Sequence, residues 1–121
     1  MVKVFRNRYL VFKVYTEKEL ALDEEDIKQT LFNTARTLFG EAWMAKLDLQ
    51  LINFNPSTLE GILKCGHKTV TETRAIIATI TSLKKEPVSL YVKGVSGTLK
   101  RARKKFTEKE AREDNNRKKE A

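Results

Sequence analysis

Five of the six residues from position 100 to position 105 are cationic, and their side chains suggest the main chemistry of this sequence. They are Lys100, Arg101, Arg103, Lys104 and Lys105. The first 13 residues add Lys3, Arg6, Arg8 and Lys13 without any acidic residue. Because residues 14–99 hold ten basic and eleven acidic side chains, the net charge of +8 is concentrated in these two segments. Such segregated cations favour a polyanionic partner, because they neutralise the phosphates of a nucleic acid.

Catalytic and metal chemistry is poorly supported by the residues present. A single His67 and a single Cys65 cannot make a zinc site, and neither a G-x-S-x-G motif nor a Walker loop is found. The acidic residues 23–26 stand at a predicted helix start, which favours capping over metal binding. Residues 16–19, Thr-Glu-Lys-Glu, differ from the anion-binding loop of acylphosphatases. We therefore expect no catalytic residue, no metal site and no cofactor bound by this protein, and a structural role for His67.

Length and composition favour one intracellular domain. A chain of 121 residues is long enough for a single core, and no apolar run approaches the roughly 18 residues that span a bilayer. The amino terminus lacks the features of a secretory signal, and a lone cysteine excludes an intrachain disulfide. We expect a soluble, cytoplasmic protein without membrane contact.

The cations must be positioned by strands and helices, which the pattern of apolar residues predicts. Residues 8–15 alternate as a strand, with Leu10, Phe12 and Val14 on one face and Tyr9, Val11, Lys13 and Tyr15 on the other. A helix follows from a cap at Asp23 to a terminator at Gly40. Residues 41–46 are expected to form an irregular or short helical connection.

Further strands and helices are predicted in the second half of the sequence. Strands are predicted at 47–54 and 59–65, joined as a hairpin by Asn-Pro-Ser. A second helix has capping-box spacing at Thr69 and Glu72 and is stopped by residues 84–87. Its predicted buried stripe is Val70, Thr73, Ile77, Ile80 and Leu83. A fourth strand at 88–95 leads through a turn to a basic helix capped by Thr98.

The resulting β-α-β-β-α-β order predicts an α+β, ferredoxin-like or RNA-recognition-motif-like fold. Its four-stranded antiparallel sheet has the order 4-1-3-2, with an extra basic helix at the carboxy terminus. The first strand then begins beside the end of the fourth, so Arg6 and Arg8 should meet residues 100–105. We expect one domain over residues 1–106, followed by a charged tail, 107–121, that is either flexible or a helical extension.

The sheet face without helices offers two interpretations. Tyr9, Lys13, Tyr91 and Lys93 are predicted on this face, where an RNA-recognition motif stacks bases. However, the third strand lacks aromatic residues, and Val11 adds an apolar position. We therefore favour a face covered by the carboxy-terminal helix or by a protein partner. Lys13 and Lys93 are candidate RNA contacts, and Tyr9, Val11 and Tyr91 are candidate residues of the partner-binding or sheet face.

Four segments together resemble the archaeal ribonuclease P protein component 2 family, the counterpart of the eukaryal Pop-five subunits. They are Arg-Asn-Arg-Tyr-Leu-Val-Phe at 6–12, Leu-Phe-Gly at 38–40, Gly-Ile-Leu-Lys-Cys at 61–65 and Gly-Val-Ser-Gly-Thr-Leu-Lys at 94–100. The resemblance extends over residues 5–106.

This resemblance implies an accessory subunit of the ribonucleoprotein that removes the 5′ leader of precursor tRNA. The catalytic RNA cleaves with Mg²⁺, and the protein binds near the RNA core with a thirty-kilodalton-type protein subunit, in a heterotetramer formed through self-association. Arg6, Arg8 and the cations of 100–105 are the expected phosphate contacts. A stand-alone binder of single-stranded RNA and a purely structural oligomerisation domain are the alternatives.

Overall fold

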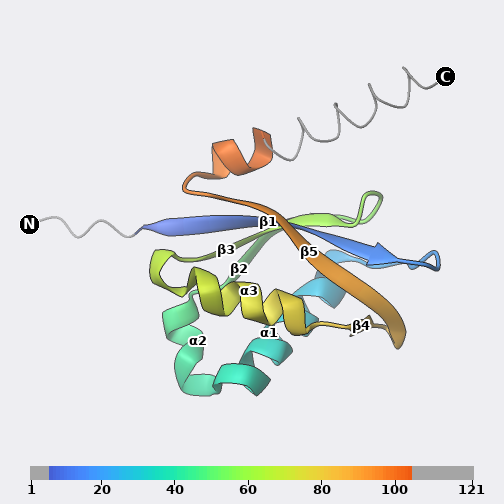
Figure 1. The fold of residues 1–121 in the computed structure, drawn as a ribbon, viewed down its shortest axis with the longest axis horizontal. Coiled ribbons are helices and arrows are strands. Elements are labelled where there is room, and N and C mark those ends of the chain that lie inside the picture. The colour runs from blue at the N-terminus through green and yellow to red at the C-terminus, as the bar shows by residue number, and fades with distance from the viewer. Residues whose placement is uncertain (1–5, 105–121) are drawn as a thin grey trace, which may run out of the picture.

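The central strand of the fold is an alternating apolar segment near the amino terminus, around which the other elements assemble (Figure 1). The computed structural model describes residues 6–104. Its elements are β1 (Asn7–Thr16), α1 (Glu24–Phe39), α2 (Glu41–Leu47), β2 (Gln50–Asn55), β3 (Glu60–Gly66), the 3-10 turn η1 (His67–Thr69), α3 (Val70–Thr79), β4 (Ser82–Leu83) and β5 (Glu86–Ser96). Residues 99–104 are also helical. The predicted α+β class is confirmed.

Within residues 6–104, the antiparallel sheet has five strands, in the order β2-β3-β1-β5-β4. The prediction of a four-stranded sheet is therefore wrong. The additional strand, β4, contains two residues, Ser82 and Leu83, which pair with Pro87 and Glu86 of β5. This short hairpin extends the sheet beyond β5.

The second helix ends earlier than predicted, and its N-cap residue, Thr69, lacks the predicted side-chain cap bond. α3 stops at Thr79, because Ile80 has extended backbone angles, and Leu83 belongs to β4. Thr69 makes no side-chain cap bond to the helix. Its hydroxyl donates instead toward two carbonyl oxygens, those of Gly66 at 3.1 Å and Leu47 at 3.4 Å.

The first helix begins as predicted, with a capping box. The Asp23 carboxylate accepts from the Asp26 N–H at 2.9 Å, and the Asp26 carboxylate accepts from the Asp23 N–H at 3.1 Å. Both cap groups are thus satisfied at the positive end of the helix dipole. Gly40 ends the helix with a φ of 87°, a conformation that favours glycine.

Helices α1, α2 and α3 lie on one side of the sheet, and helical residues 99–104 lie on the other (Figure 1). The main core fills the space between the three helices and the sheet, and includes Leu10, Phe12 and Val14 of β1. A smaller apolar cluster of Val11, Ile62 and Ala102 lies between the sheet and residues 99–104. The sheet therefore packs against helical residues on both faces.

Candidate nucleic-acid interface

The register of β1 and β5 brings the two cationic segments of the sequence to one end of the sheet. β5 ends beside the start of antiparallel β1, where Tyr9 lies opposite Ser96. A Cβ atom placed on Gly97 would lie 3.6 Å from the Arg8 Nη1 atom, so Arg8 borders the turn that leads into residues 99–104. We define the cationic end as the side chains of Arg6, Arg8, Lys100, Arg101, Arg103 and Lys104.

A hydrogen-bonded cap fixes the start of the helical residues at this end. The Thr98 hydroxyl accepts a hydrogen bond from the Arg101 N–H at 3.2 Å. The Thr98 carbonyl accepts another from the Ala102 N–H at 3.1 Å. Thr98 is therefore the helix cap that the sequence predicts.

Two apolar side chains hold the same helical residues against the sheet. Ala102 is fully buried and packs with Val11 and Ile62, while Leu99 and Tyr9 pack against that cluster at its border. This packing leaves Lys100, Arg101, Arg103 and Lys104 exposed. Four cations are thus presented from an anchored element. The fifth predicted cation, Lys105, lies outside the described residues.

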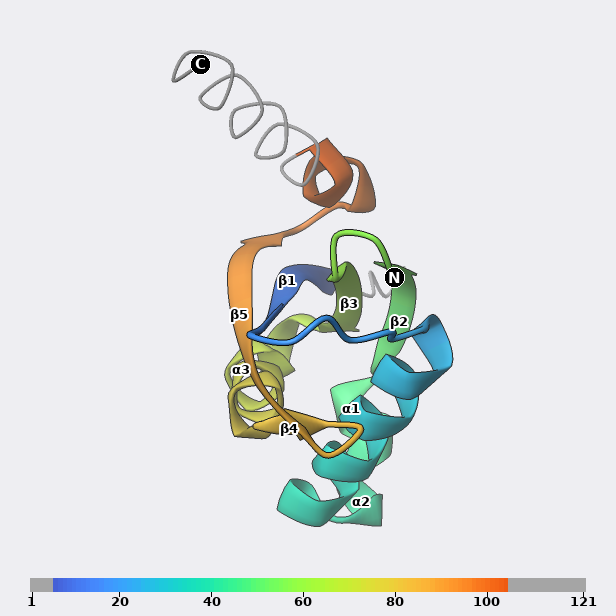
Figure 2. The same ribbon diagram turned by 90° about the vertical axis from the view of Figure 1, so that its right-hand side faces the viewer.

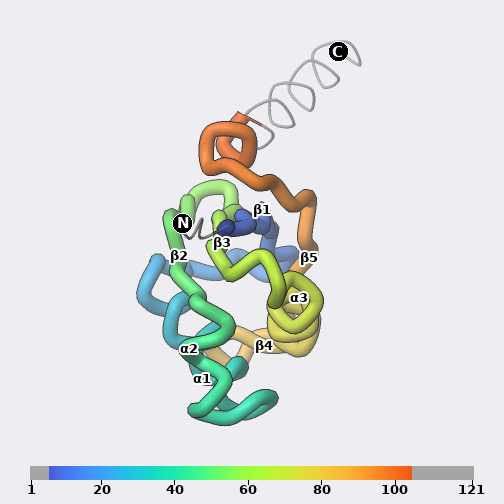
Figure 3. The backbone as a smooth tube through the Cα atoms, turned by 90° about the vertical axis from the view of Figure 1, so that its left-hand side faces the viewer, coloured from blue at the N-terminus to red at the C-terminus, as the bar shows by residue number. Residues whose placement is uncertain are grey.

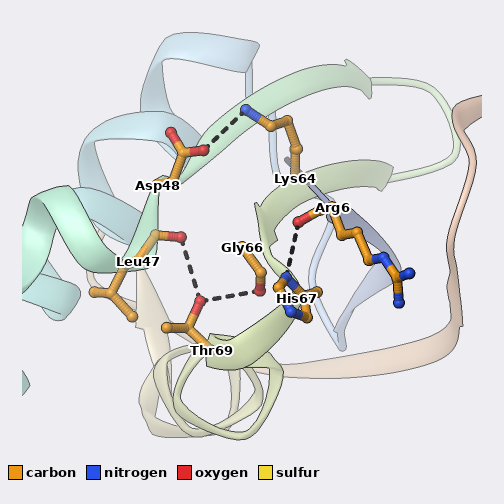
Figure 4. Close-up of polar contacts among 7 residues, drawn as sticks. All are labelled: Arg6, Leu47, Asp48, Lys64, Gly66, His67 and Thr69. Carbon is orange, nitrogen blue, oxygen red and sulfur yellow. Dashed lines mark hydrogen bonds and ion pairs between the residues drawn. The ribbon is translucent and has the colours of Figure 1, made fainter. Parts of the chain in front are cut away.

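The main chain of Arg6 is fixed beside the end of β3. The His67 N–H donates to the Arg6 carbonyl oxygen at 3.1 Å, and the His67 Nδ1 atom lies 3.3 Å from the same oxygen. Figure 4 shows the Arg6 guanidinium directed away from this hydrogen bond. His67 therefore holds the chain that carries Arg6, in agreement with a structural role.

The two lysines predicted on the open sheet face are bound to a buried carboxylate. Glu60 is only 1% exposed, and its Oε1 atom lies 2.9 Å from the Lys93 Nζ atom and 3.8 Å from the Lys13 Nζ atom. The Glu60 Oε2 atom has no hydrogen-bond partner in the described part of the chain. Glu60 therefore neutralises one of the two positive charges locally.

The three other predicted sheet-face residues differ in exposure. Val11 is buried under Ala102, and Tyr9 is half-buried beside it. Tyr91 is 59% exposed. The structure thus covers two of these residues with the carboxy-terminal helical residues and leaves Tyr91 accessible.

Two residues of this face were not among the candidate site residues predicted from the sequence. Glu60 follows a turn, and its position opposite Lys13 becomes visible only with the pairing register. Tyr15 is 49% exposed, and the Lys13 Nζ atom lies 5.2 Å from the centre of its ring. The alternating pattern placed Tyr15 on this face, but its exposure depends on where the helical cover ends.

The groups with nucleophilic or metal-binding chemistry are not assembled into a site within residues 6–104. Cys65 is buried, and this burial raises the pKa of its thiol, which disfavours the reactive thiolate. No group of three His, Cys, Asp or Glu side chains with metal-binding geometry is found in this range. None of the helices in the same range is long and apolar enough to cross a membrane.

Comparisons with known proteins agree with the sequence resemblance. A model of the Rpp14/Pop5 family matches residues 8–107. The chain is 33% identical over 105 residues to ribonuclease P protein component 2 of Methanosarcina mazei, covering 87% of each chain. It is also 33% identical over 101 residues to the protein of the same name from Pyrococcus furiosus, covering 84% of this chain and 82% of the relative.

A solved structure has the same fold at much lower identity. A chain in the cryo-electron microscopy structure of yeast ribonuclease MRP superposes with a TM-score of 0.65 and 12% sequence identity. The match covers 98% of both chains. The fold is therefore shared over nearly the whole length.

Proposed function

The chain belongs to the Rpp14/Pop5 family of ribonuclease P protein subunits, and we propose from this premise that it binds the catalytic RNA of a ribonuclease P. Ribonuclease P removes the 5′ leader from precursor tRNA, so the chain acts in tRNA maturation and meets the precursor indirectly. The RNA performs the cleavage and binds the Mg²⁺ that the reaction needs. The protein stabilises the active shape of that RNA.

The observation that carries this proposal is the joining of two distant cationic segments. Arg8 borders the turn that leads into residues 99–104, where four further cations are exposed. Held on an anchored element, these side chains neutralise neighbouring phosphates of a folded RNA and release its counterions. They require no particular base, as expected for side chains that position a protein on an RNA backbone.

The buried part of the open face argues against a stand-alone base-stacking module. Such a module presents aromatic side chains from the middle of its sheet. Here Val11 and Ile62 occupy that area and are buried against Ala102. The cationic end therefore remains the better candidate for RNA contact.

The same family membership supports protein partners in the assembly. We propose a thirty-kilodalton-type ribonuclease P protein subunit as one partner, in a heterotetramer formed through self-association of this chain. We also propose that the assembly works in the cytoplasm.

Purification of the tagged full chain from the cells in which it is native tests the proposed function. The expected particle contains a large structured RNA and several small proteins. It removes the 5′ leader from precursor tRNA in the presence of Mg²⁺, and nuclease digestion of the RNA abolishes this activity. An assembly without RNA, or one that leaves precursor tRNA uncut, contradicts the proposal.

A further inference from the structure

Within residues 6–104, another strand covers the outer edge of β5 only at its beginning. β4 pairs with Glu86 and Pro87, and the Val88 N–H donates to the Thr81 carbonyl at 3.0 Å. Beyond Val88, β5 continues along β1 to Ser96. Figures 2 and 3 show β5 as the outermost long strand on its side of the sheet.

The direction of the main-chain groups on this edge follows from the hydrogen bonding of β1. The Val14 N–H donates to Leu59, on the β3 side of β1, so the neighbouring residues Lys13 and Tyr15 direct their main-chain groups toward β5. In an antiparallel pair, the residue opposite each of them also directs its N–H and C=O groups toward the facing strand. These residues are Tyr91 and Ser89, respectively.

Leu90 and Val92 must then direct their N–H and C=O groups away from β1. The outward bond of Val88, two residues earlier, agrees with this alternation. Within residues 6–104, no strand pairs with β5 at Leu90 or Val92 on the outer side. A β-bulge at Lys93 then interrupts the regular pairing with β1, so the open edge is short.

Exposed aromatic residues and a groove lie along the part of β5 that precedes and adjoins this open stretch. Tyr91 is 59% exposed and Tyr15 is 49% exposed, and the pairing register places them on the same face of neighbouring strands. A groove of about 520 Å³ is lined by residues 15–18, at the end of β1 and in the loop after it, and by residues 86–89 of β5. Outward-facing main-chain groups and a partly apolar groove thus follow one another along β5.

The charges of the groove favour a protein over RNA as the occupant. Lys18 lies 3.9 Å from Glu86, and Glu17 adds a further negative charge to the lining. Lys13 is held near Glu60. The groove also lies at the opposite end of β1 from the cationic end, since β1 begins near Arg8 and ends at Thr16. A phosphate backbone finds no excess of cations here.

We propose that the edge of β5 at Leu90 and Val92 binds an extended segment of a partner protein by strand addition. The partner's main chain pairs with the two outward-facing residues, and an apolar or proline side chain of the segment enters the groove beside Tyr15. The inference deepens the proposed function, because the partner is another protein subunit of the same ribonucleoprotein. It concerns a surface separate from the cationic end.

Amide hydrogen exchange at single-residue resolution tests the proposal, with the free chain compared to the ribonucleoprotein isolated through a tag on this chain. The amides of Leu90 and Val92 should exchange roughly 100-fold more slowly in the assembly, as for groups that become hydrogen-bonded in a stable complex. Ser89 and Tyr91 are internal controls, because their amides point toward β1 and should be protected in both samples. The slow exchange should persist after the RNA has been digested.

Several results would overturn the inference. Equal exchange of Leu90 and Val92 in both samples means that no strand is added. Slow exchange in the free monomer means that another part of the chain covers the edge. Slow exchange only in a dimer of the free chain assigns the edge to a second copy, and slow exchange that disappears with the RNA assigns it to RNA. If the particle contains its RNA but these amides stay fast, the inference fails and the proposed function stands.

A substitution provides a second test. Val92→Pro removes one outward N–H while leaving the bonds between β5 and β1, as proline is tolerated on the solvent side of an edge strand. The variant should bind the protein subunits of the particle at least roughly 10-fold more weakly, because one main-chain hydrogen bond and its geometry are removed. Its RNA affinity should be unchanged. Undiminished binding of the protein subunits by a folded variant contradicts the proposal. If the variant does not fold, the exchange experiment alone tests the proposal.

Discussion

At the scale of single residues, Glu60 supplies the negative charge that faces the two lysines of the open sheet face. Its buried carboxylate lies between two ammonium groups, 2.9 Å from Lys93 and 3.8 Å from Lys13. The Lys93 side chain is only 7% exposed, so the carboxylate compensates a charge that has little access to water. Both lysines therefore have a structural partner before any ligand arrives.

Glu60→Gln should destabilise the fold because it removes the buried carboxylate that lies 2.9 Å from the Lys93 ammonium. Loss of one partner of a buried ion pair costs about 3–5 kcal/mol, and the free energy of unfolding in urea should fall by an amount near the lower limit. The double variant Glu60→Gln, Lys93→Met is the matched control. It should recover much of the stability, since the ammonium that the Glu60 carboxylate compensates is removed as well. A double variant no more stable than Glu60→Gln would show that this ion pair is unimportant.

Sequence reasoning identified Lys13 and Lys93 as cations of one face but assigned both to RNA. Sequence reasoning did not identify Glu60 as the partner of these lysines, because Glu60 lies at the end of a turn and has no distinctive neighbours in sequence. RNA contact by the two lysines stays a prediction. Cross-strand pairs depend on register, and a shift of one residue would turn Glu60 to the other face. The residue types were therefore visible in advance, whereas their partners were not.

At the scale of elements, the amino terminus of α1 is linked to the β4–β5 turn. The Lys84 ammonium lies 3.1 Å from the Asp26 carboxylate and donates to the Ala21 carbonyl at 2.8 Å. The hydrogen bond from the Asp23 N–H and the nearby Lys84 hold the pKa of the Asp26 carboxyl below its ordinary value of 3.8. The ionised carboxylate thus stabilises the cap and the turn together.

This lowered pKa gives the stability of the protein a defined pH dependence. Because the pKa of the Asp26 carboxyl is lower in the folded state, the ionised carboxylate stabilises the fold above pH 3.8. This stabilisation is lost as the pH falls through the folded-state pKa. Asp26→Asn should therefore be less stable than the parent in urea at pH 7, and the difference should shrink at pH 3. Glu24→Gln, in the same helix turn, is the control and should show a smaller difference. A deficit of Asp26→Asn that is the same at both pH values would contradict this account.

The same turn explains why one element was mispredicted. Lys84 and Lys85 both have positive φ values, 49° and 66°, although lysine gives no sequence signal for this conformation. The spacing of Ile77, Ile80 and Leu83 continued a helical pattern, so a longer helix was expected. Tertiary pairing with β5 prevails over this local pattern and makes Leu83 part of a strand. By contrast, the cap at Asp23 follows from local chemistry and was predicted correctly.

At the scale of the whole molecule, the topology brings two separate charge clusters to the same end of the sheet. The β-α-β-β-α-β pattern was readable from hydrophobic periodicity, and chain direction alone then places the start of β1 near the end of β5. Sequence could also suggest a covered open face. It could not show that Ala102 and Leu99 form this cover, because their packing with Val11 and Ile62 depends on the path of the chain after Ser96.

The molecule therefore separates its two proposed binding surfaces. Cations gather where β1 begins, whereas the open edge of β5 and the exposed Tyr15 and Tyr91 lie toward the end of β1. A subunit with this arrangement can bind RNA phosphates and a protein segment at the same time. The cationic end carries the central claim, because the proposed RNA binding depends on it.

The salt dependence of RNA binding tests that claim most directly. The triple variant Arg8→Gln, Lys100→Gln, Arg101→Gln should bind the RNA of the native particle more weakly. The slope of log affinity against log salt concentration should become less steep by about 2, near 0.7 for each phosphate that is no longer neutralised. The control Lys18→Gln, Lys28→Gln, Lys85→Gln removes the same charge elsewhere and should keep the parent slope. Equal slopes for the two triple variants would contradict the account.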